Sequence, residues 1–193
     1  MRSGRFRRPE ISSSTVPKRI IPVASGKGGV GKTTFAVNFA LALSRFAPTI
    51  LVDLDPGTSS VRSSLAAPVT KDLYHFHRKG AQLHECITRL DPSFDRTGQY
   101  RRFGFVAGPK HFIEEMGNPS AEFRRRLSEA VNALPVDYVV LDLRAGLDAN
   151  VLDFLPYTNS GMLVVTPNLP QATLAASDIV KAILFRTLRM IFA

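Results

Sequence analysis

A glycine-rich run over residues 26–34, GKGGVGKTT, constrains the fold of this chain more than any other feature of its sequence. The run satisfies the pattern G-x-x-x-x-G-K-[ST], which ends in Lys32 and Thr33. An apolar stretch over 20–24 precedes it, and apolar residues at helical spacing follow it over 32–45. Strand, loop and helix in this order form the context of a phosphate-binding loop. The sequence therefore predicts a nucleotide site rather than a glycine-rich turn without a ligand.

Each residue type in this loop suits the binding of phosphate. Glycines let the backbone curl so that several N–H groups point inward at the start of the following helix. Lys32 is expected to reach the β- and γ-phosphates of ATP, and the hydroxyl of Thr33 is expected to ligate Mg²⁺. The expected nucleotide-binding residues of the loop are Gly26, Lys27, Gly28, Gly29, Val30, Gly31, Lys32, Thr33 and Thr34.

Aliphatic, strand-like runs alternate with segments of helical spacing after residue 19. Buried strands separated by helices are typical of a mostly parallel sheet with helices on both faces, so we expect an α/β fold. Ligands of such sheets bind beyond the carboxyl ends of the strands. The expected strands span 20–24, 49–54, 103–107, 138–143 and 162–166, and the expected helices span 32–45, 119–133 and 171–191.

Acidic residues close two of the expected strands. Asp53 and Asp55 end the second strand, and Asp142 ends the fourth. A phosphoryl-transfer site needs an oxygen ligand near Mg²⁺ and a group that orients the attacking water, although Asp-x-Asp-Pro-Gly by itself is also typical of a turn. Asp142 is expected to hold Mg²⁺ through water, and Gly146 to bring a backbone N–H to the γ-phosphate. The expected metal residues are Thr33, Asp55 and Asp142.

A second lysine, Lys27, distinguishes this loop from ordinary phosphate-binding loops. Residues 27–33 resemble the deviant Walker A signature of the MinD/ParA family of ATPases. The resemblance implies that Lys27 crosses a dimer interface to the phosphates of the partner's nucleotide, and hence an ATP-dependent homodimer. Residues 53–56 resemble the second motif of the family, which implies that Asp55 orients the attacking water near the metal. Lys27, Lys32 and Asp55 are therefore the expected catalytic residues.

Two further segments carry the resemblance. Residues 136–146 resemble the Walker B strand and switch region, most closely in the FlhG/MinD-like branch. Arg144 departs from the small residues expected there and suits either a phosphate or partner contact or a solvated side chain. Residues 164–174 resemble the stretch beside the nucleotide base, where Pro167 is expected to contact the nucleotide. Relatives continue with further strands, so the ATPase domain over 19–193 is expected to be truncated at its C-terminus.

The resemblance implies a Mg²⁺-dependent ATPase whose ATP-bound dimer positions a cellular structure: the division site, a flagellum or a chromosome. Slow hydrolysis stimulated by a partner protein and a cytoplasmic location, with peripheral contact at the inner face of the membrane, belong to the same expectation. A truncated module that binds nucleotide or a partner without catalysis is the alternative.

Charge and cysteine content bear on partners. The chain has 25 Lys and Arg against 16 Asp and Glu, a net charge of +9, which favours nucleotide, anionic lipid or nucleic acid as partners. DNA contact rests on this charge alone. The single cysteine, Cys86, excludes an internal disulfide and the paired cysteines of iron–sulfur relatives. Residues 1–18 predict a disordered basic arm, for which a solvated tail, membrane or DNA contact and an organelle transit peptide are alternatives.

Two segments have two interpretations each. His75, His77, His84 and Cys86 supply four metal-capable groups within twelve residues. This suggests zinc, but their aromatic and aliphatic neighbours favour a packing or interaction surface. The helix over 171–191 has an aliphatic and a cationic face, which suits core packing, the favoured interpretation, or an interfacial membrane helix.

Overall fold

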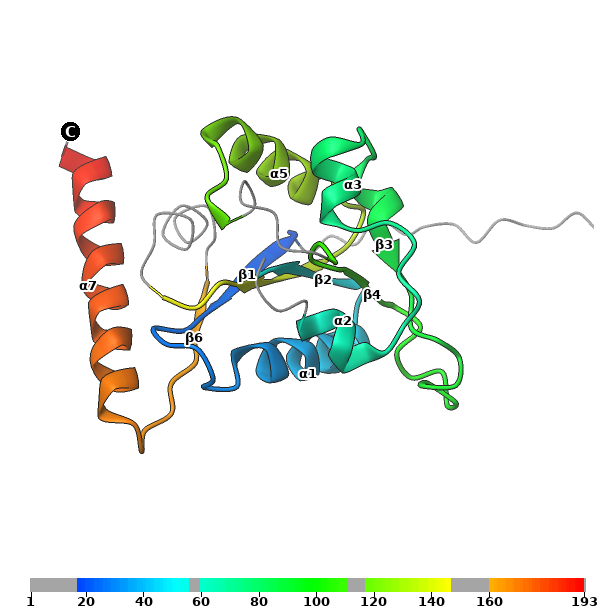
Figure 1. Cartoon of the computed structure of the whole chain (residues 1–193), viewed down its shortest axis with the longest axis horizontal. Coiled ribbons are helices and arrows are strands. Elements are labelled where there is room, and N and C mark those ends of the chain that lie inside the picture. Colours follow the sequence, from blue (N-terminus) through cyan, green and yellow to red (C-terminus); the bar gives the residue numbers. More distant parts are fainter. Residues whose placement is uncertain (1–16, 56–59, 111–116, 147–159, 193) are drawn as a thin grey trace, which may run out of the picture.

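The computed structural model describes residues 17–55, 60–110, 117–146 and 160–192. Its centre is a six-stranded sheet in the order β3-β4-β2-β5-β1-β6 (Figure 1). Every neighbouring pair is parallel except β3 and β4, which are antiparallel. The α/β fold with a mostly parallel sheet is therefore confirmed. The strands are β1 (Arg19–Ala24), β2 (Thr49–Leu54), β3 (Ile87–Thr88), β4 (Phe103–Val106), β5 (Tyr138–Leu143) and β6 (Met162–Leu163).

Helices cover both faces of the sheet (Figure 1). On one face the core includes Ala36 of α1, Val61 of α2 and Phe105 of β4. On the other it includes Phe76 of α3 and Phe123 of α5. Successive residues of β2 and β5 enter the two cores alternately, which explains their continuous aliphatic sequences. The helices are α1 (Lys32–Ser44), α2 (Ser60–Leu65), α3 (Leu73–Arg78), the 3-10 helix η1 (Leu83–Cys86), α5 (Ala121–Ala133) and α7 (Pro170–Phe192).

All five expected strands and all three expected helices are present, but the fifth strand is shorter than predicted. It ends at Leu163, because after Val164, whose N–H still donates to Ala24 O at 2.9 Å, the chain enters a turn. The short elements α2, α3, η1 and β3 were not predicted. They have two to six residues each, too few for an apolar period to show in the sequence.

The strand register brings the predicted acidic residues to one level of the sheet. β5 lies between β1 and β2, so Asp142 pairs with Val23 on one side and with Asp53 on the other. The glycine-rich loop leaves β1 directly beyond this level. The loop and the ends of β2 and β5 therefore meet at the carboxyl edge of the sheet, where ligands of such folds bind.

The first half of α7 packs against the body, and its second half is largely exposed. Ala172, Ala176 and Ile179 are buried. The favoured packing interpretation therefore holds for this half only, because most of the aliphatic face on which it rested lies in the second half and is exposed. Large apolar side chains that are exposed on this helix are Leu174, Val180, Leu184, Phe185, Leu188, Ile191 and Phe192. None of the helices in the described ranges is long and apolar enough to cross a membrane.

Most of the predicted basic arm, residues 1–16, lies outside the described residues. Lys18, which the sequence places in this arm, contacts the C-terminus of α5. Its Nζ donates to the backbone carbonyls of Asn132 and Leu134 and lies 3.4 Å from Val131 O. A lysine at this position complements the negative end of the helix dipole.

Candidate nucleotide site

The glycines of the loop meet two different requirements. Gly29 and Gly31 have φ angles of 80° and 87°, a left-handed conformation that side chains disfavour. A Cβ added at either position would meet nothing within 4 Å, so their surroundings stay open to a ligand. Gly26 is different: a Cβ there would lie 2.5 Å from the backbone carbon of Ala175 in α7. Glycine at this position allows the close approach of α7 to the loop.

The start of α1 offers its backbone donors to an anion. Gly31 precedes the helix, and no side chain among the described residues caps it. The first turn contains no acidic residue. The N–H groups of this turn and the positive end of the helix dipole therefore face the mouth of the loop, which suits a phosphate group.

Lys32 lies between two carboxylates at this mouth. Its side chain is only 6% exposed, and its Nζ donates to Asp142 Oδ1 at 2.6 Å. The same Nζ is 3.9 Å from Asp55 Oδ2. An ammonium group this buried needs negative partners, and the phosphates of a nucleotide can take the place of a carboxylate.

The two register partners Asp53 and Asp142 form a buried acidic pair. Burial, and next the charge of Asp142, raise the pKa of Asp53 from 3.8 to about 7, although the backbone N–H of Asp55, which donates to Asp53 Oδ1 at 3.1 Å, opposes the shift. Burial also raises the pKa of Asp142, against the opposing effects of Lys32 and of the Thr33 hydroxyl. Both carboxyls are therefore held under electrostatic strain that added positive charge would relieve.

The donors around this pair fit Mg²⁺. Asp53 Oδ2 and Asp142 Oδ2 are buried oxygens without a hydrogen-bond partner among the described residues. The Thr33 hydroxyl interacts with Asp142, so the predicted metal residues Thr33 and Asp142 are adjacent. Within the same residues, no three His, Cys, Asp or Glu side chains are arranged to hold a metal by themselves. Mg²⁺ commonly uses one or two protein ligands, with phosphate oxygens and water completing its coordination.

Three predicted nucleotide contacts lie apart from this cluster or have other partners. Lys27 is exposed, and its Nζ donates to Gln171 Oε1 at 2.8 Å. The N–H of Gly146 donates to Ser25 O at 2.9 Å, so it faces the start of the loop instead of an open phosphate position. Pro167 lies in an exposed turn before α7.

Arg144 and the histidine stretch have separate surroundings. Arg144 is exposed, and its Nη1 lies 3.5 Å from Gly117 O. His75 contacts Asp72, the ring of His77 packs against Phe123 with centroids 4.6 Å apart, and the thiol of Cys86 faces Gln82 O. His77 and Cys86 thus contribute to packing, in line with the interpretation favoured from the sequence, whereas His84 is exposed.

Sequence reasoning missed three residues that shape the site. Ser25 accepts the hydrogen bond of Gly146, Gln171 holds Lys27, and Gly108 packs against the second strand end, where a Cβ would lie 3.3 Å from Asp53 Cγ. Ser25 directly precedes the loop, so its place in the sequence could have identified it. The other two contact the site only through the tertiary fold, so no local pattern marks them.

Comparison with known proteins assigns the chain to a family. Residues 21–163 match the model of the CobQ/CobB/MinD/ParA nucleotide binding domain. The chain belongs to this family. Together with the phosphate-binding loop, this makes it a MinD/ParA-type nucleotide-binding domain.

Curated members of this family align with most of the chain. A chloroplastic septum site-determining protein minD homolog of Arabidopsis thaliana is 28% identical over 173 residues, covering 84% of this chain and 49% of the relative. The antiactivator FleN of Pseudomonas aeruginosa is 29% identical over 150 residues, covering 77% and 51%. The chain thus spans about half the length of the curated relatives it matches.

Solved structures share the fold. The septum site-determining protein MinD of Pyrococcus horikoshii, complexed with Mg-ADP, superposes with a TM-score of 0.69 at 23% identity, covering 88% of this chain and 66% of that one. A plasmid partition protein of Borrelia burgdorferi gives 0.70 at 21% identity, covering 90% and 75%. The MinD/ParA fold is therefore common to all three.

Proposed function

We propose that this chain binds and hydrolyses ATP with Mg²⁺ and works as an ATP-driven dimer that positions a cellular structure. The observation that carries the proposal is the placement of Lys32 at the loop mouth, 2.6 Å from Asp142 and 3.9 Å from Asp55. This arrangement joins a phosphate-binding cation to the carboxylates that a metal-assisted phosphoryl transfer requires.

The residues of the site divide the work of hydrolysis among them. The N–H groups at the start of α1 and the Lys32 ammonium bind the β- and γ-phosphates. Thr33 would ligate Mg²⁺ directly and Asp142 through water, and the bound ion would neutralise negative charge on the phosphates. Asp55 orients the water for in-line attack on the γ-phosphate. In support, the P. horikoshii MinD structure is a complex with Mg-ADP.

Dimerisation gives Lys27 its role. Because this side chain is exposed and, among the described residues, hydrogen-bonds only to the amide of Gln171, it can be released toward the nucleotide of a second copy. Lys27 would then stabilise negative charge that develops on the partner's phosphates during hydrolysis.

Positioning and partner stimulation are supported by the names of relatives. Relatives of this chain are described as septum site-determining proteins and as a flagellum site-determining protein of Helicobacter pylori. A MinD of Aquifex aeolicus forms a complex with MinC. We infer a partner protein for this chain too, which accelerates a slow intrinsic hydrolysis. DNA and membrane surfaces are further candidate contacts, given the net charge of +9.

Hydrolysis of ATP by the purified chain with Mg²⁺ tests the proposal. We expect phosphate release above that of a Lys32→Ala control, and mass measurement by light scattering should show a dimer with ATP and a monomer with ADP. The assay is repeated with anionic vesicles and with duplex DNA. Release equal to the control under all conditions would contradict the enzymatic proposal.

A second candidate is nucleotide binding without turnover. It is favoured by the internal hydrogen bonds of Lys27 and Gly146, which engage both groups away from the phosphate position. This candidate would be supported if a fluorescent ATP analogue binds the chain, if Lys32→Ala abolishes that binding, and if neither hydrolysis nor dimerisation is detected. Normal turnover would exclude it.

A further inference from the structure

A cavity of about 510 Å³ lies beside the nucleotide site and has no role in the function proposed so far. Its volume is within the range of ligand-binding pockets. It is formed between α2, α3 and the segment that follows β4. Its lining includes Arg62, Val69, Asp72, Tyr74, Pro109 and Lys110.

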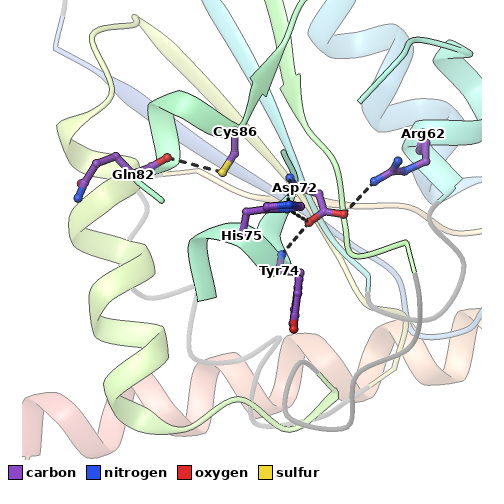
Figure 2. A network of polar contacts seen from close by, with 6 residues as sticks. All are labelled: Arg62, Asp72, Tyr74, His75, Gln82 and Cys86. Carbon is purple, nitrogen blue, oxygen red and sulfur yellow. Dashed lines mark hydrogen bonds and ion pairs between the residues drawn. The ribbon is translucent and has the colours of Figure 1, made fainter. Parts of the chain in front are cut away.

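The only carboxylate among these residues is already occupied. Asp72 is buried, and its Oδ1 accepts the Tyr74 N–H at 3.1 Å and lies 2.8 Å from His75 Nδ1. Its Oδ2 accepts from Arg62 Nη2 at 3.0 Å (Figure 2). Both oxygens of Asp72 are thus engaged, and its charge is already paired with that of Arg62.

Two cations line the cavity, Arg62 and Lys110. Arg62 Nε is buried without a hydrogen-bond partner among the described residues, and only one terminal nitrogen of this guanidinium is bonded to Asp72. Lys110 is exposed and adds a second positive charge. Because the planar guanidinium matches the geometry of a carboxylate, these two positive charges complement an acidic group.

Part of the remaining lining is apolar, beside the polar Thr70 and His75. Val69, Pro109 and the ring of Tyr74 face the same cavity. A ligand that combines a carboxylate with an apolar neighbour satisfies both kinds of lining at once. A short peptide segment with an acidic residue next to a Leu or Phe has this chemistry, whereas a small inorganic anion would leave the apolar part unfilled.

The cavity is connected to the carboxylates of the nucleotide site through its own wall. At the start of α3 the Leu73 N–H donates to Ala107 O at 3.0 Å. The next residue, Gly108, packs so closely against the end of β2 that a Cβ would lie 3.3 Å from Asp53 Cγ and 3.4 Å from Asp55 O. A ligand that shifts Pro109 or α3 therefore acts on the backbone that carries Asp55.

We propose that this cavity binds an acidic peptide segment of a partner protein, with Arg62 and Lys110 receiving its carboxylate and Tyr74 and Pro109 its apolar side chain. Binding through this cavity adjusts the position of Asp55 and so the rate of ATP hydrolysis. The binding step stands apart from turnover, whereas the effect on rate rests on the proposed function.

Fluorescent, terminally blocked octapeptides that place one Glu beside one Leu or Phe are the probes for binding, each with a matched Gln version. Fluorescence anisotropy with the full chain should show saturable binding of at least one Glu peptide, weakened roughly 10-fold or more in its Gln version. Lys110→Gln should weaken it by a similar factor, and Lys181→Gln, which removes an exposed lysine of α7, should not. Arg62→Gln is a further variant, read only where its circular dichroism matches the wild type, because Arg62 also bonds to Asp72.

Several results would overturn the binding proposal. They are the failure of every peptide to bind, equal binding of Glu and Gln versions, and unchanged binding by Lys110→Gln. Displacement of the peptide by inorganic phosphate alone, with phosphate binding that Lys110→Gln abolishes, would assign the cavity to a free anion instead.

Hydrolysis assays then test the coupling. A bound Glu peptide should change the ATP hydrolysis rate of the wild type at least 2-fold and leave Lys110→Gln, whose basal rate is unaltered, unchanged. If the wild type hydrolyses ATP at the same rate with and without bound peptide, the coupling is refuted but the binding is not. If the chain hydrolyses no ATP, the proposed function is refuted, and the anisotropy measurement still decides whether the cavity binds the peptide.

Discussion

Lys27 Nζ donates to Gln171 Oε1 at 2.8 Å, so the signature lysine of the loop is held by the first turn of α7 in its own chain. A contact across a dimer interface requires this bond to break. A hydrogen bond to a charged group contributes about 1.5–3 kcal/mol when it is shielded from water, and exposure reduces this one to about 1 kcal/mol. The fold therefore sets a small, removable cost on the dimer that the family resemblance implies.

Gln171→Ala is expected to strengthen ATP-dependent dimerisation by roughly 30-fold, because each of the two subunits no longer gives up about 1 kcal/mol when its Lys27 leaves α7. Gln171→Glu should weaken dimerisation, since a carboxylate holds the ammonium more strongly. Sedimentation equilibrium with a non-hydrolysable ATP analogue measures both. Thr173→Ala, at an exposed neighbouring position, is the matched control. Equal dissociation constants for all four proteins would show that the contact has no part in dimerisation.

Lys32→Ala is expected to lower ATP hydrolysis roughly 100-fold or more, because it removes a buried donor aimed at developing phosphate charge. Its loss also leaves Asp142 buried without its 2.6 Å cationic partner. Isothermal titration calorimetry should show weakened ATP binding, and phosphate release should show the lost turnover. Lys181→Ala on α7 is the control for loss of one positive charge. Turnover by Lys32→Ala near the wild-type rate would place the phosphates elsewhere.

The sequence predicted the parts of the fold that depend on local pattern. Continuous aliphatic runs identified β2 and β5, and the glycine pattern fixed the loop between β1 and α1. The helix α3 escaped prediction because it depends on the fold: the Asp72 side chain caps it, and Phe76 contacts Phe123 of α5. Short elements of this kind are stabilised by tertiary contacts more than by their own propensity.

For the site, the sequence identified the residues but not their distances. Asp53 and Asp142 are 89 positions apart, and only the strand order, with β5 between β1 and β2, makes them neighbours. The partners of Lys27 and Gly146 depend in the same way on how distant segments pack. The sequence gives the chemical type of each side chain, whereas its hydrogen-bond partner depends on the folded structure.

Asp53 should make the metal-free protein less stable as the pH rises. Its folded pKa of about 7 lies above the ordinary value of 3.8, so the folded state binds the proton more tightly than the unfolded state. Stability from this group is therefore full below pH 3.8 and is lost as the pH rises toward 7, by a total on the order of 4 kcal/mol.

Asp53→Asn removes this titration and keeps an oxygen that can accept the Asp55 N–H. With EDTA present, urea unfolding at pH 5 and pH 8 should show a smaller loss of stability in Asp53→Asn than in the wild type. Asp178→Asn, at an exposed position of α7, should follow the wild type. Identical pH dependence of the wild type and Asp53→Asn would mean that Asp53 ionises normally in the fold.

Gly26→Ala should detach the start of α7 from the loop. The added Cβ would lie 2.5 Å from the backbone carbon of Ala175 and 2.7 Å from the N of Ala176, and backbone atoms cannot rotate away as a side chain can. Overpacking of this kind costs about 1–3 kcal/mol.

Gly28→Ala is the matched control, because a Cβ at Gly28 meets nothing within 4 Å and its φ is not positive. In urea unfolding without nucleotide, Gly26→Ala should lose stability and Gly28→Ala should stay within about 0.5 kcal/mol of the wild type. Equal stability of the two variants would show that α7 does not pack on the loop in solution, and that Lys27 is free of Gln171 in the unliganded chain.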